Sequence, residues 1–167
     1  MTTMPAQKPG RSKQDYETPP EFIRAVENLL EIEYFYVDLA ADRHNAKGAI
    51  YFTERDDSLL QDWDAFSGKG WCWLNPPFAH IAPWAKKCSE SGIKIAFLVP
   101  AAVGSNWFRD YVDGKARVLL LNGRISFDGV GPYPKDTILC LYGVEPGYEV
   151  CSWRQQHGNG VPVATTV

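Results

Sequence analysis

The stretch that decides the fold runs from residue 70 to residue 78 and reads GWCWLNPPF. Its first half is a short apolar run that starts at a glycine, which is typical of a buried β-strand. Its second half consists of Asn75, Pro76, Pro77 and Phe78. Two consecutive prolines fix φ and remove two backbone donors, so a loop has to begin there. We therefore expect a buried strand that delivers these four residues to one edge of a sheet.

The chemistry of this tetrad indicates a site for an amino group attached to a ring. The prolines leave the carbonyl groups of Asn75 and Pro76 without a local N–H that competes for them. The Asn75 side chain adds another acceptor, and Phe78 adds a flat apolar face. Such a site can bind an exocyclic amino group from two sides while Phe78 stacks on the attached ring. The structural alternative is a Pro-Pro pair that only ends a strand.

The composition suits one soluble domain. The chain has 167 residues, of which 45% are hydrophobic and 13% aromatic, enough for one packed core. No apolar stretch approaches the roughly 20 residues that span a bilayer. The polar N-terminal residues also lack the apolar segment of a signal peptide. We expect a cytoplasmic protein without a membrane partner.

Cysteine and charge patterns give little sign of a metal or of nucleic acid. The four cysteines form no C-x-x-C pair, and the three histidines do not stand at ligand spacing beside them. We therefore expect neither a metal site nor a disulfide framework. The net charge of −3 is not that of a typical nucleic-acid-binding protein. Basic residues do cluster at 8–13 and at 109–124, although solvated surfaces carry such clusters too.

Strand and helix patterns alternate along most of the chain. Apolar runs predict strands at residues 34–37, 49–53, 71–74, 93–99, 117–121 and 137–142. Helical spacing predicts helices at 19–31 and 81–91, and a short one capped by Ser105 and closed by Gly114. Near-continuous apolar strands are buried on both faces, so the pattern predicts an α/β fold with a mainly parallel central sheet flanked by helices. The last strand is expected to be an antiparallel C-terminal strand.

Local signals add two expectations about the ends of the domain. Residues 18–21 read TPPE, which predicts a capping box with Thr18 as the helix N-cap. The chain is expected to become irregular from Gly147. We divide it into a flexible basic arm at 1–14, a domain at 15–150 and an irregular tail at 151–167.

The ordered set of motifs resembles one known family. The tetrad at Asn75 resembles the (Asp/Asn/Ser)-Pro-Pro-(Tyr/Phe/Trp) motif of amino-methyltransferases that use S-adenosylmethionine. More closely, the chain resembles the small phage-type DNA N6-adenine methyltransferases, the phage Dam family. The matching segments are YETPPEF (16–22), VDLAA (37–41), NAK (45–47), DSL (57–59) with Trp63, the tetrad, Pro100 with Trp107 and Phe108, and GRISF (123–127).

The resemblance implies a Rossmann-like methyltransferase fold for residues 15–150, with S-adenosylmethionine as cofactor and double-stranded DNA as partner. Asn75, Pro76, Pro77 and Phe78 would be the catalytic residues, acting on the N6 amino group of a flipped-out adenine. The chain has no room for a separate recognition domain, and a homodimer is one way to supply the missing surface. The sequence does not reveal the recognition site.

The same resemblance assigns the cofactor site. Thr18 and Pro19 would lie near the methionine part of the cofactor, for which plain helix capping is the alternative. Asp38 would face the amino acid portion of the cofactor, with a surface turn as its alternative reading. Ala40 belongs to the loop at 38–42, which has no glycine, unlike the corresponding loop of larger relatives.

Two acidic side chains compete for the adenine end of the cofactor. Asp57 would contact the adenine amino group, and Asp56 is its rival. Glu54 would reach the ribose hydroxyls.

Other functions fit the same residues. The methyl acceptor could instead be cytosine N4, an RNA guanine or a protein glutamine, although asparagine at the first tetrad position favours adenine. The glycine-poor loop also fits a decayed domain that binds DNA or a protein partner without turnover.

Overall fold

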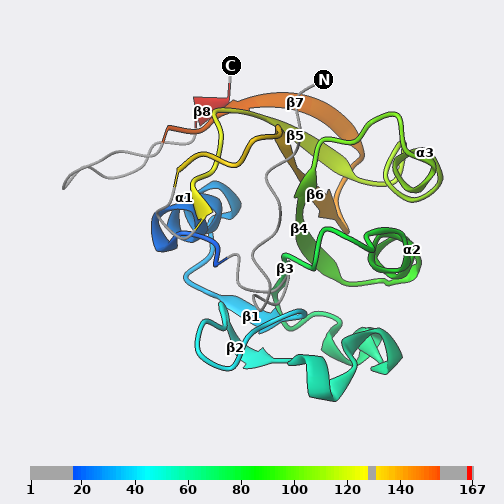
Figure 1. Ribbon diagram of the computed structural model, residues 1–167. Helices are drawn as coiled ribbons and strands as arrows, with labels where there is room; N and C mark the ends of the chain where they lie inside the picture. The colour runs from blue at the N-terminus through cyan, green and yellow to red at the C-terminus, as the bar shows by residue number, and fades with distance from the viewer. Residues whose placement is uncertain (1–16, 128–130, 155–164, 167) are drawn as a thin grey trace.

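The computed structural model describes residues 17–127, 131–154 and 165–166 (Figure 1). The predicted basic arm at 1–14 lies outside these residues. Within them, eight strands form one sheet in the order β2-β1-β3-β4-β6-β5-β7-β8. The strands are β1 (Phe35–Asp38), β2 (Gly48–Tyr51), β3 (Trp71–Leu74), β4 (Lys94–Pro100), β5 (Arg117–Asn122), β6 (Thr137–Tyr142), β7 (Gly147–Ser152) and β8 (Thr165–Thr166).

Three α-helices cover the two faces of the sheet. Figure 1 shows α1 (Pro20–Leu30) on one face, with α2 (Ala82–Glu90) and α3 (Asn106–Tyr111) on the other. These bounds confirm the predicted helices to within a few residues. Short 3-10 turns, η1 (Glu54–Asp56), η2 (Ser58–Leu60) and η3 (Trp63–Phe66), fill the connection between β2 and β3.

The sheet is mixed, which confirms the expected α/β architecture in part. Strand β1 runs parallel to β2 and β3, β3 parallel to β4, and β5 parallel to β7. Strand β6 is antiparallel to both of its neighbours, β4 and β5, and β8 is antiparallel to β7. The antiparallel strand predicted at 137–142 therefore lies inside the sheet and is not the last strand of the chain.

The prediction of an irregular chain from Gly147 is wrong for β7. This strand pairs with β5 along its whole length, from Arg117 opposite Gly147 to Asn122 opposite Ser152. Only Cys151 in it is buried, while Tyr148 and Val150 are exposed. The strand lacks the continuous apolar run that marks a strand buried on both faces, so its sequence gives a weak strand signal.

The predicted capping box at the start of α1 is also wrong. Pro19, not Thr18, is the N-cap, and no side-chain hydrogen bond caps the helix among the residues that the structure describes. The Pro19 carbonyl accepts from the N–H groups of Phe22 and Ile23, and Pro20 has no N–H that needs a partner. The helix therefore begins without a side-chain cap, and Thr18 is left for another contact. The Ser105 cap of α3 is confirmed, because its hydroxyl accepts from the N–H of Phe108.

Alternation along the strands divides the core into two layers. In β3, Trp71 and Trp73 pack in the layer of α1, and Cys72 and Leu74 pack in the layer of α2 and α3. Successive side chains of a strand point to opposite faces, so Asn75 leaves β3 on the α1 side of the sheet. Both tryptophans are buried, which confirms the buried strand predicted at 71–74.

None of the helices in the described part of the chain is long and apolar enough to cross a membrane. The cysteines at 72, 88, 140 and 151 are free and buried. Within the same described residues, no group of three or more His, Cys, Asp or Glu side chains is arranged to hold a metal ion.

Candidate active site

The strand order reverses at β1, and the predicted site residues gather at this reversal. The chain passes from β1 to β2 on one side and later to β3 on the other side. In α/β sheets, ligands bind beyond the carboxyl ends of the strands at such a point. Asp38 is the last residue of β1 and pairs with Trp73, two residues before Asn75. The structure therefore brings Asp38 and Asn75 to adjacent strand ends.

The tetrad lies at the end of β3 and is only partly covered. Pro76 is buried, whereas Asn75, Pro77 and Phe78 are half-buried. The side-chain amide of Asn75 donates through Nδ2 to the hydroxyl oxygen of Thr18, at 2.9 Å. Thr18 is only 2% exposed, so this bond is shielded from water. It joins the segment before α1 to the end of β3.

Phe78 belongs to a group of three aromatic rings. Its ring contacts those of Phe127 and Tyr133 edge to face, with centroid separations of 6.2 and 5.6 Å. Phe127 and Tyr133 also contact each other edge to face, at 5.7 Å. Tyr133 is missing from the sequence prediction, and Phe127 entered it only through the resemblance. The available signal is that Phe127 directly precedes the Gly/Pro-rich stretch at 128–136 that leads into β6, and Tyr133 belongs to that stretch.

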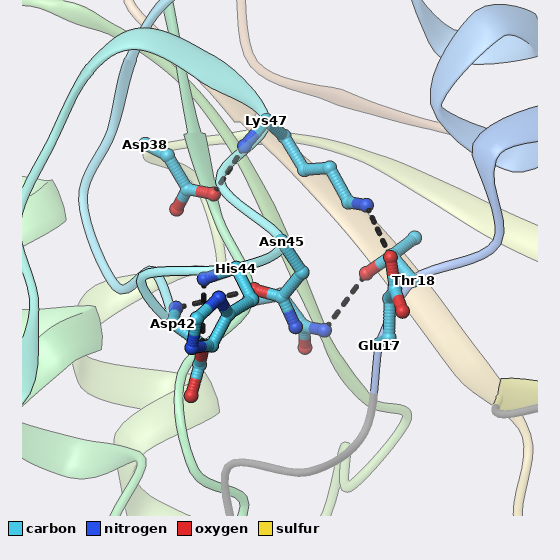
Figure 2. A network of polar contacts seen from close by, with 8 residues as sticks. Glu17, Thr18, Asp38, Asp42, His44, Asn45 and Lys47 are labelled. Atoms are coloured by element: carbon cyan, nitrogen blue, oxygen red, sulfur yellow. Dashed lines mark hydrogen bonds and ion pairs between the residues drawn. The ribbon is translucent and has the colours of Figure 1, made fainter.

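Asp38 is a buried carboxyl group that holds the loop after β1. It is 3% exposed, and its two oxygens accept from the N–H groups of Ala40 and Lys47, at 3.2 and 2.8 Å. The ammonium group of Lys47 forms an ion pair with Glu17 at 3.0 Å (Figure 2). Burial raises the pKa of Asp38 to about 6, and the two hydrogen bonds and Lys47 oppose this rise. Asp38 thus connects the two ends of the loop at 39–47.

Side chains rather than glycines shape this loop. Asp42 accepts from the N–H of His44 at 2.9 Å, and Asn45 accepts from the N–H of Asp42 at 3.2 Å. Figure 2 shows these bonds beside those of Asp38 and Thr18. The close approach occurs at Gly48 instead, where an added Cβ would lie 2.3 Å from the backbone nitrogen of Asp38. A glycine-free loop is therefore compatible with a tightly packed strand end.

A cavity of about 130 Å³ opens beside the loop, at the ends of β1 and β2. Three residues of the predicted cofactor site line it, namely Ala40, Glu54 and Asp57. Phe52 and Trp84 also line it, and the sequence prediction assigns neither to the site. Their signal was weak, because single aromatic residues in amphipathic segments are more often part of a core.

The structure gives the two competing carboxylates, Asp56 and Asp57, different surroundings. Asp56 accepts from both the N–H and the hydroxyl of Thr53, at 2.7 and 2.8 Å, and these bonds lower its pKa. Asp57 instead lines the cavity and has a left-handed backbone, with φ of 45°. Such a conformation is costly for most residues other than glycine, aspartate and asparagine, and it often occurs at functional sites. Asp56 is thus part of a turn, and Asp57 is the carboxylate at the cavity.

Trp63 supports the cavity wall from behind. Its indole N–H donates to the carbonyl of Ser58 at 2.9 Å, and its ring stacks on Trp84 with a centroid separation of 6.3 Å. The ammonium group of Lys87 lies 5.0 Å from the centre of the Trp63 ring. Because Ser58 and Trp84 both line the cavity, Trp63 fixes two sides of it.

The remaining residues of the resemblance lie outside this cavity. Phe108 is buried in the core of the α2 and α3 face, and Trp107 packs against the same core. Arg124 is exposed and forms a hydrogen-bonded ion pair with Asp136 at 3.4 Å.

Comparison with known proteins fits this arrangement of tetrad, loop and cavity. The sequence model of the family described as DNA N-6-adenine-methyltransferase (Dam) matches residues 6–138. This chain belongs to the Dam family. The Dam match includes the tetrad, the loop after β1 and the cavity residues, and it ends inside β6.

One curated relative carries the same name. The DNA N-6-adenine-methyltransferase of Haemophilus phage HP1 (strain HP1c1) is 26% identical to this chain over 120 residues. The aligned region covers 69% of this chain and 66% of the phage protein. The chain therefore spans just under two thirds of that relative.

The raised pKa of Asp38 predicts a pH dependence of stability. The pKa of Asp38 is about 6 in the folded protein, against an ordinary value of 3.8 for the unfolded chain. The folded protein therefore binds the proton of this carboxyl group more tightly than the unfolded chain does. Its stabilising contribution is complete below pH 4 and is lost as the pH rises through 6. We expect the wild type to lose about 3 kcal/mol of unfolding free energy relative to Asp38→Asn over this interval. Urea unfolding of both proteins from pH 4 to pH 7 measures this difference, and a constant difference would contradict the assignment.

Proposed function

We propose that this protein transfers a methyl group from S-adenosylmethionine to the N6 amino group of adenine in double-stranded DNA. The observation that carries the proposal is the position of the tetrad at the end of β3, next to the strand whose loop borders the cavity. Membership of the Dam family supports the same reaction. We assign the sheet, with its reversal at β1 and its inserted antiparallel β6, to the Rossmann-like methyltransferase class.

The cavity would hold the adenine end of the cofactor. Phe52 and Trp84 offer apolar surfaces to the faces of a purine. The cavity volume of about 130 Å³ is close to the roughly 150 Å³ that admits a benzene-sized ring. Asp57 would accept from the adenine amino group, and Glu54 would accept from the ribose hydroxyls. Ala40 would border the cofactor with its backbone, because its small side chain leaves room for close approach.

The methionine part of the cofactor would extend from the cavity across the end of β1 toward the tetrad. Asp38 would face its amino acid portion, as the resemblance implies. The hydroxyl of Thr18 is bonded to Asn75, so contact from this segment falls to the Thr18 backbone and the Pro19 ring. When bound, S-adenosylmethionine supplies a methyl group on a sulfonium, which is already a strong methyl donor.

The tetrad would orient the acceptor nitrogen. Adenine N6 is a poor nucleophile because its lone pair is delocalised into the ring. The Asn75 side-chain oxygen and the Pro76 carbonyl would accept from its two hydrogens and favour a pyramidal nitrogen whose lone pair faces the methyl group. Pro77 fixes the backbone that carries the Pro76 carbonyl. Catalysis would then come mainly from alignment.

Phe78 would hold the ring of the adenine. Inside a duplex N6 cannot reach this site, so the nucleotide has to flip out, at a cost of a few kcal/mol. Stacking of a base on an aromatic side chain contributes about 1–3 kcal/mol and offsets part of that cost. Phe127 and Tyr133 fix the Phe78 ring by edge contacts.

Replacement of Asn75 tests the proposed chemistry. We expect Asn75→Ala to lower the rate of DNA methylation at least 100-fold, because it removes an acceptor that orients N6. The rise in melting temperature on addition of S-adenosylmethionine should persist, since the cavity is untouched. Asn28→Ala, at an exposed position of α1, is the matched control. Loss of the cofactor-induced rise in a folded Asn75→Ala protein would assign this residue to cofactor binding instead.

The two neighbouring carboxylates give a paired test of the cavity. We expect Asp57→Asn to weaken S-adenosylmethionine binding about tenfold, the size of one hydrogen bond to a charged group, with little change in stability. Asparagine tolerates the left-handed backbone at this position. Asp56→Asn should lower the unfolding midpoint and leave the affinity nearly unchanged. Calorimetric titration and thermal unfolding of both variants measure these effects, and a reversed pattern would place Asp56 at the cofactor.

A further inference from the structure

We propose that Arg124 and Lys135 bind phosphates of the DNA on the side of the tetrad away from the cofactor cavity, and that Arg124 exchanges its ion pair with Asp136 for a phosphate when DNA binds. The inference rests on the proposed function, because it names the surface that receives the DNA substrate. Neither the cavity nor the tetrad assigns a residue to this surface.

The chemistry of methyl transfer decides on which side the DNA approaches. The acceptor nitrogen has to lie in line with the methyl group and the sulfur, so donor and acceptor occupy opposite sides of the methyl group. The proposed cofactor lies at the ends of β1 and β2, where the cavity opens. Strand β3 has β1 on that side and β4 on the other. The adenine therefore approaches the tetrad from the side of β4, β6 and β5.

The strand directions bring Arg124 and Lys135 to the same edge of the sheet as the tetrad. Strands β3 and β4 are parallel, and β6 begins at Thr137, opposite the last residue of β4. Strand β5 is antiparallel to β6, so it ends at Asn122 beside the start of β6. Arg124 comes two residues after the end of β5, and Lys135 comes two residues before the start of β6. Both are exposed.

The connection between β5 and β6 also contacts the tetrad. Phe127 and Tyr133 lie on this connection, and both rings contact the ring of Phe78 edge to face. The N–H of Tyr133 donates to the carbonyl of Ile125 at 2.8 Å, which joins the two described parts of the connection. Because Phe78 would hold the flipped adenine, the phosphates that flank this nucleotide would pass close to the connection.

The backbone on both sides of Arg124 is held in place. At Gly123, φ is 126° and an added Cβ would lie 1.7 Å from the carbonyl oxygen of Trp153. The N–H of Trp153 donates to the carbonyl of Asn122 at 2.8 Å. On the other side, Ile125 is fully buried. The guanidinium group therefore extends from a fixed backbone, which limits the entropy lost when it binds a phosphate.

The ion pair with Asp136 is weak enough to be exchanged. Nε of Arg124 lies 3.4 Å from Oδ1 of Asp136, and the two side chains are 52% and 73% exposed. Ion pairs as long and as exposed as this one contribute little to stability. A guanidinium group can bind a phosphate through two parallel N–H bonds, so a phosphate is a stronger partner for Arg124. Lys135 adds a second positive charge beside it.

The charges at the cavity favour the same orientation of the DNA. Of the described residues that line the cavity, Glu54 and Asp57 carry a charge. Their carboxylates suit a cationic sulfonium and repel a phosphate backbone. Arg124 and Lys135 lie on the other side of the tetrad, where they attract the DNA away from the cofactor.

The salt dependence of DNA binding tests the inference. Each phosphate contact adds about 0.9 to the slope of log affinity against log salt concentration, and it does so for any DNA sequence. We expect Arg124→Gln and Lys135→Gln each to lower this slope by about 1 and the affinity about tenfold at roughly 0.1 M salt. Fluorescence anisotropy of a short labelled DNA duplex measures both quantities. An unchanged slope in Arg124→Gln would overturn the inference.

Replacement of Asp136 gives a change of the opposite sign. Asp136→Asn removes the competing partner of Arg124 and a negative charge beside the phosphate, so the affinity for the duplex should rise severalfold. If the ion pair only stabilised the connection, Asp136→Asn and Arg124→Gln would change the affinity in the same direction. That outcome would also overturn the inference. Thermal unfolding checks that both variants are folded.

Arg117→Gln is the matched control. Arg117 begins β5 at the opposite edge of the sheet and forms an exposed ion pair with Glu149 at 2.7 Å. Its replacement should leave the slope unchanged. A slope lowered as much as in Arg124→Gln would show a general effect of charge and would contradict a contact at Arg124.

The outcomes also separate this inference from the proposed function. A wild-type protein that binds no duplex at low salt would overturn the phosphate contacts. A wild type that binds DNA but methylates none would contradict the proposed function. An active wild type with an unchanged slope in Arg124→Gln would contradict only the assigned surface.

Discussion

The candidate site depends on the parallel pairing of β1 with β3. Val37 lies opposite Cys72 and Asp38 opposite Trp73, and the N–H of Leu39 continues the pairing by donating to the Trp73 carbonyl at 2.9 Å. Both strands are buried, so their carboxyl ends cannot shift relative to each other without disturbing the core. This register places the loop that borders the cavity next to the strand end that carries the tetrad. Alignment of a donor and an acceptor requires such a fixed relation.

The loop after β1 shows how this edge is built without glycine. Asp38 has both oxygens occupied by N–H groups of the loop, and side chains of Asp42 and Asn45 close its turn. The buried carboxyl group is costly to ionise, as its raised pKa records. Its two backbone bonds and the nearby Lys47 offset part of that cost. The chain thus keeps a buried, fully hydrogen-bonded acidic residue at the point where the proposed cofactor crosses the sheet.

Much of the fold could be predicted because the hydrophobic patterns along the chain match the residues that the structure buries. The apolar strands, the helices and the strand that delivers Asn75 all lie within a few residues of their predicted places. Strand β7 was not predictable in this way, because its pairing with β5 rather than its own hydrophobicity defines it. Thr18 looks like a cap by its neighbours in the chain, but a residue 57 positions away takes its hydroxyl. A contact between residues so far apart in the chain cannot be predicted from the neighbouring sequence.

The candidate site was predictable to a similar degree. Ala40, Glu54 and Asp57 do meet at one cavity, and the choice between Asp56 and Asp57 needed the backbone geometry of the turn. Trp84 comes from a distant helix, so its place in the cavity wall depends on how α2 packs.

The most direct measurement is the identity of the methylated product. Purified protein and labelled S-adenosylmethionine are incubated in parallel reactions with double-stranded DNA, with RNA and with protein. Each substrate is then digested, and the labelled product is identified by mass spectrometry. The account predicts label in N6-methyladenine from DNA. Label only in N4-methylcytosine, in RNA or in protein, or none at all from a protein that binds the cofactor, would contradict it.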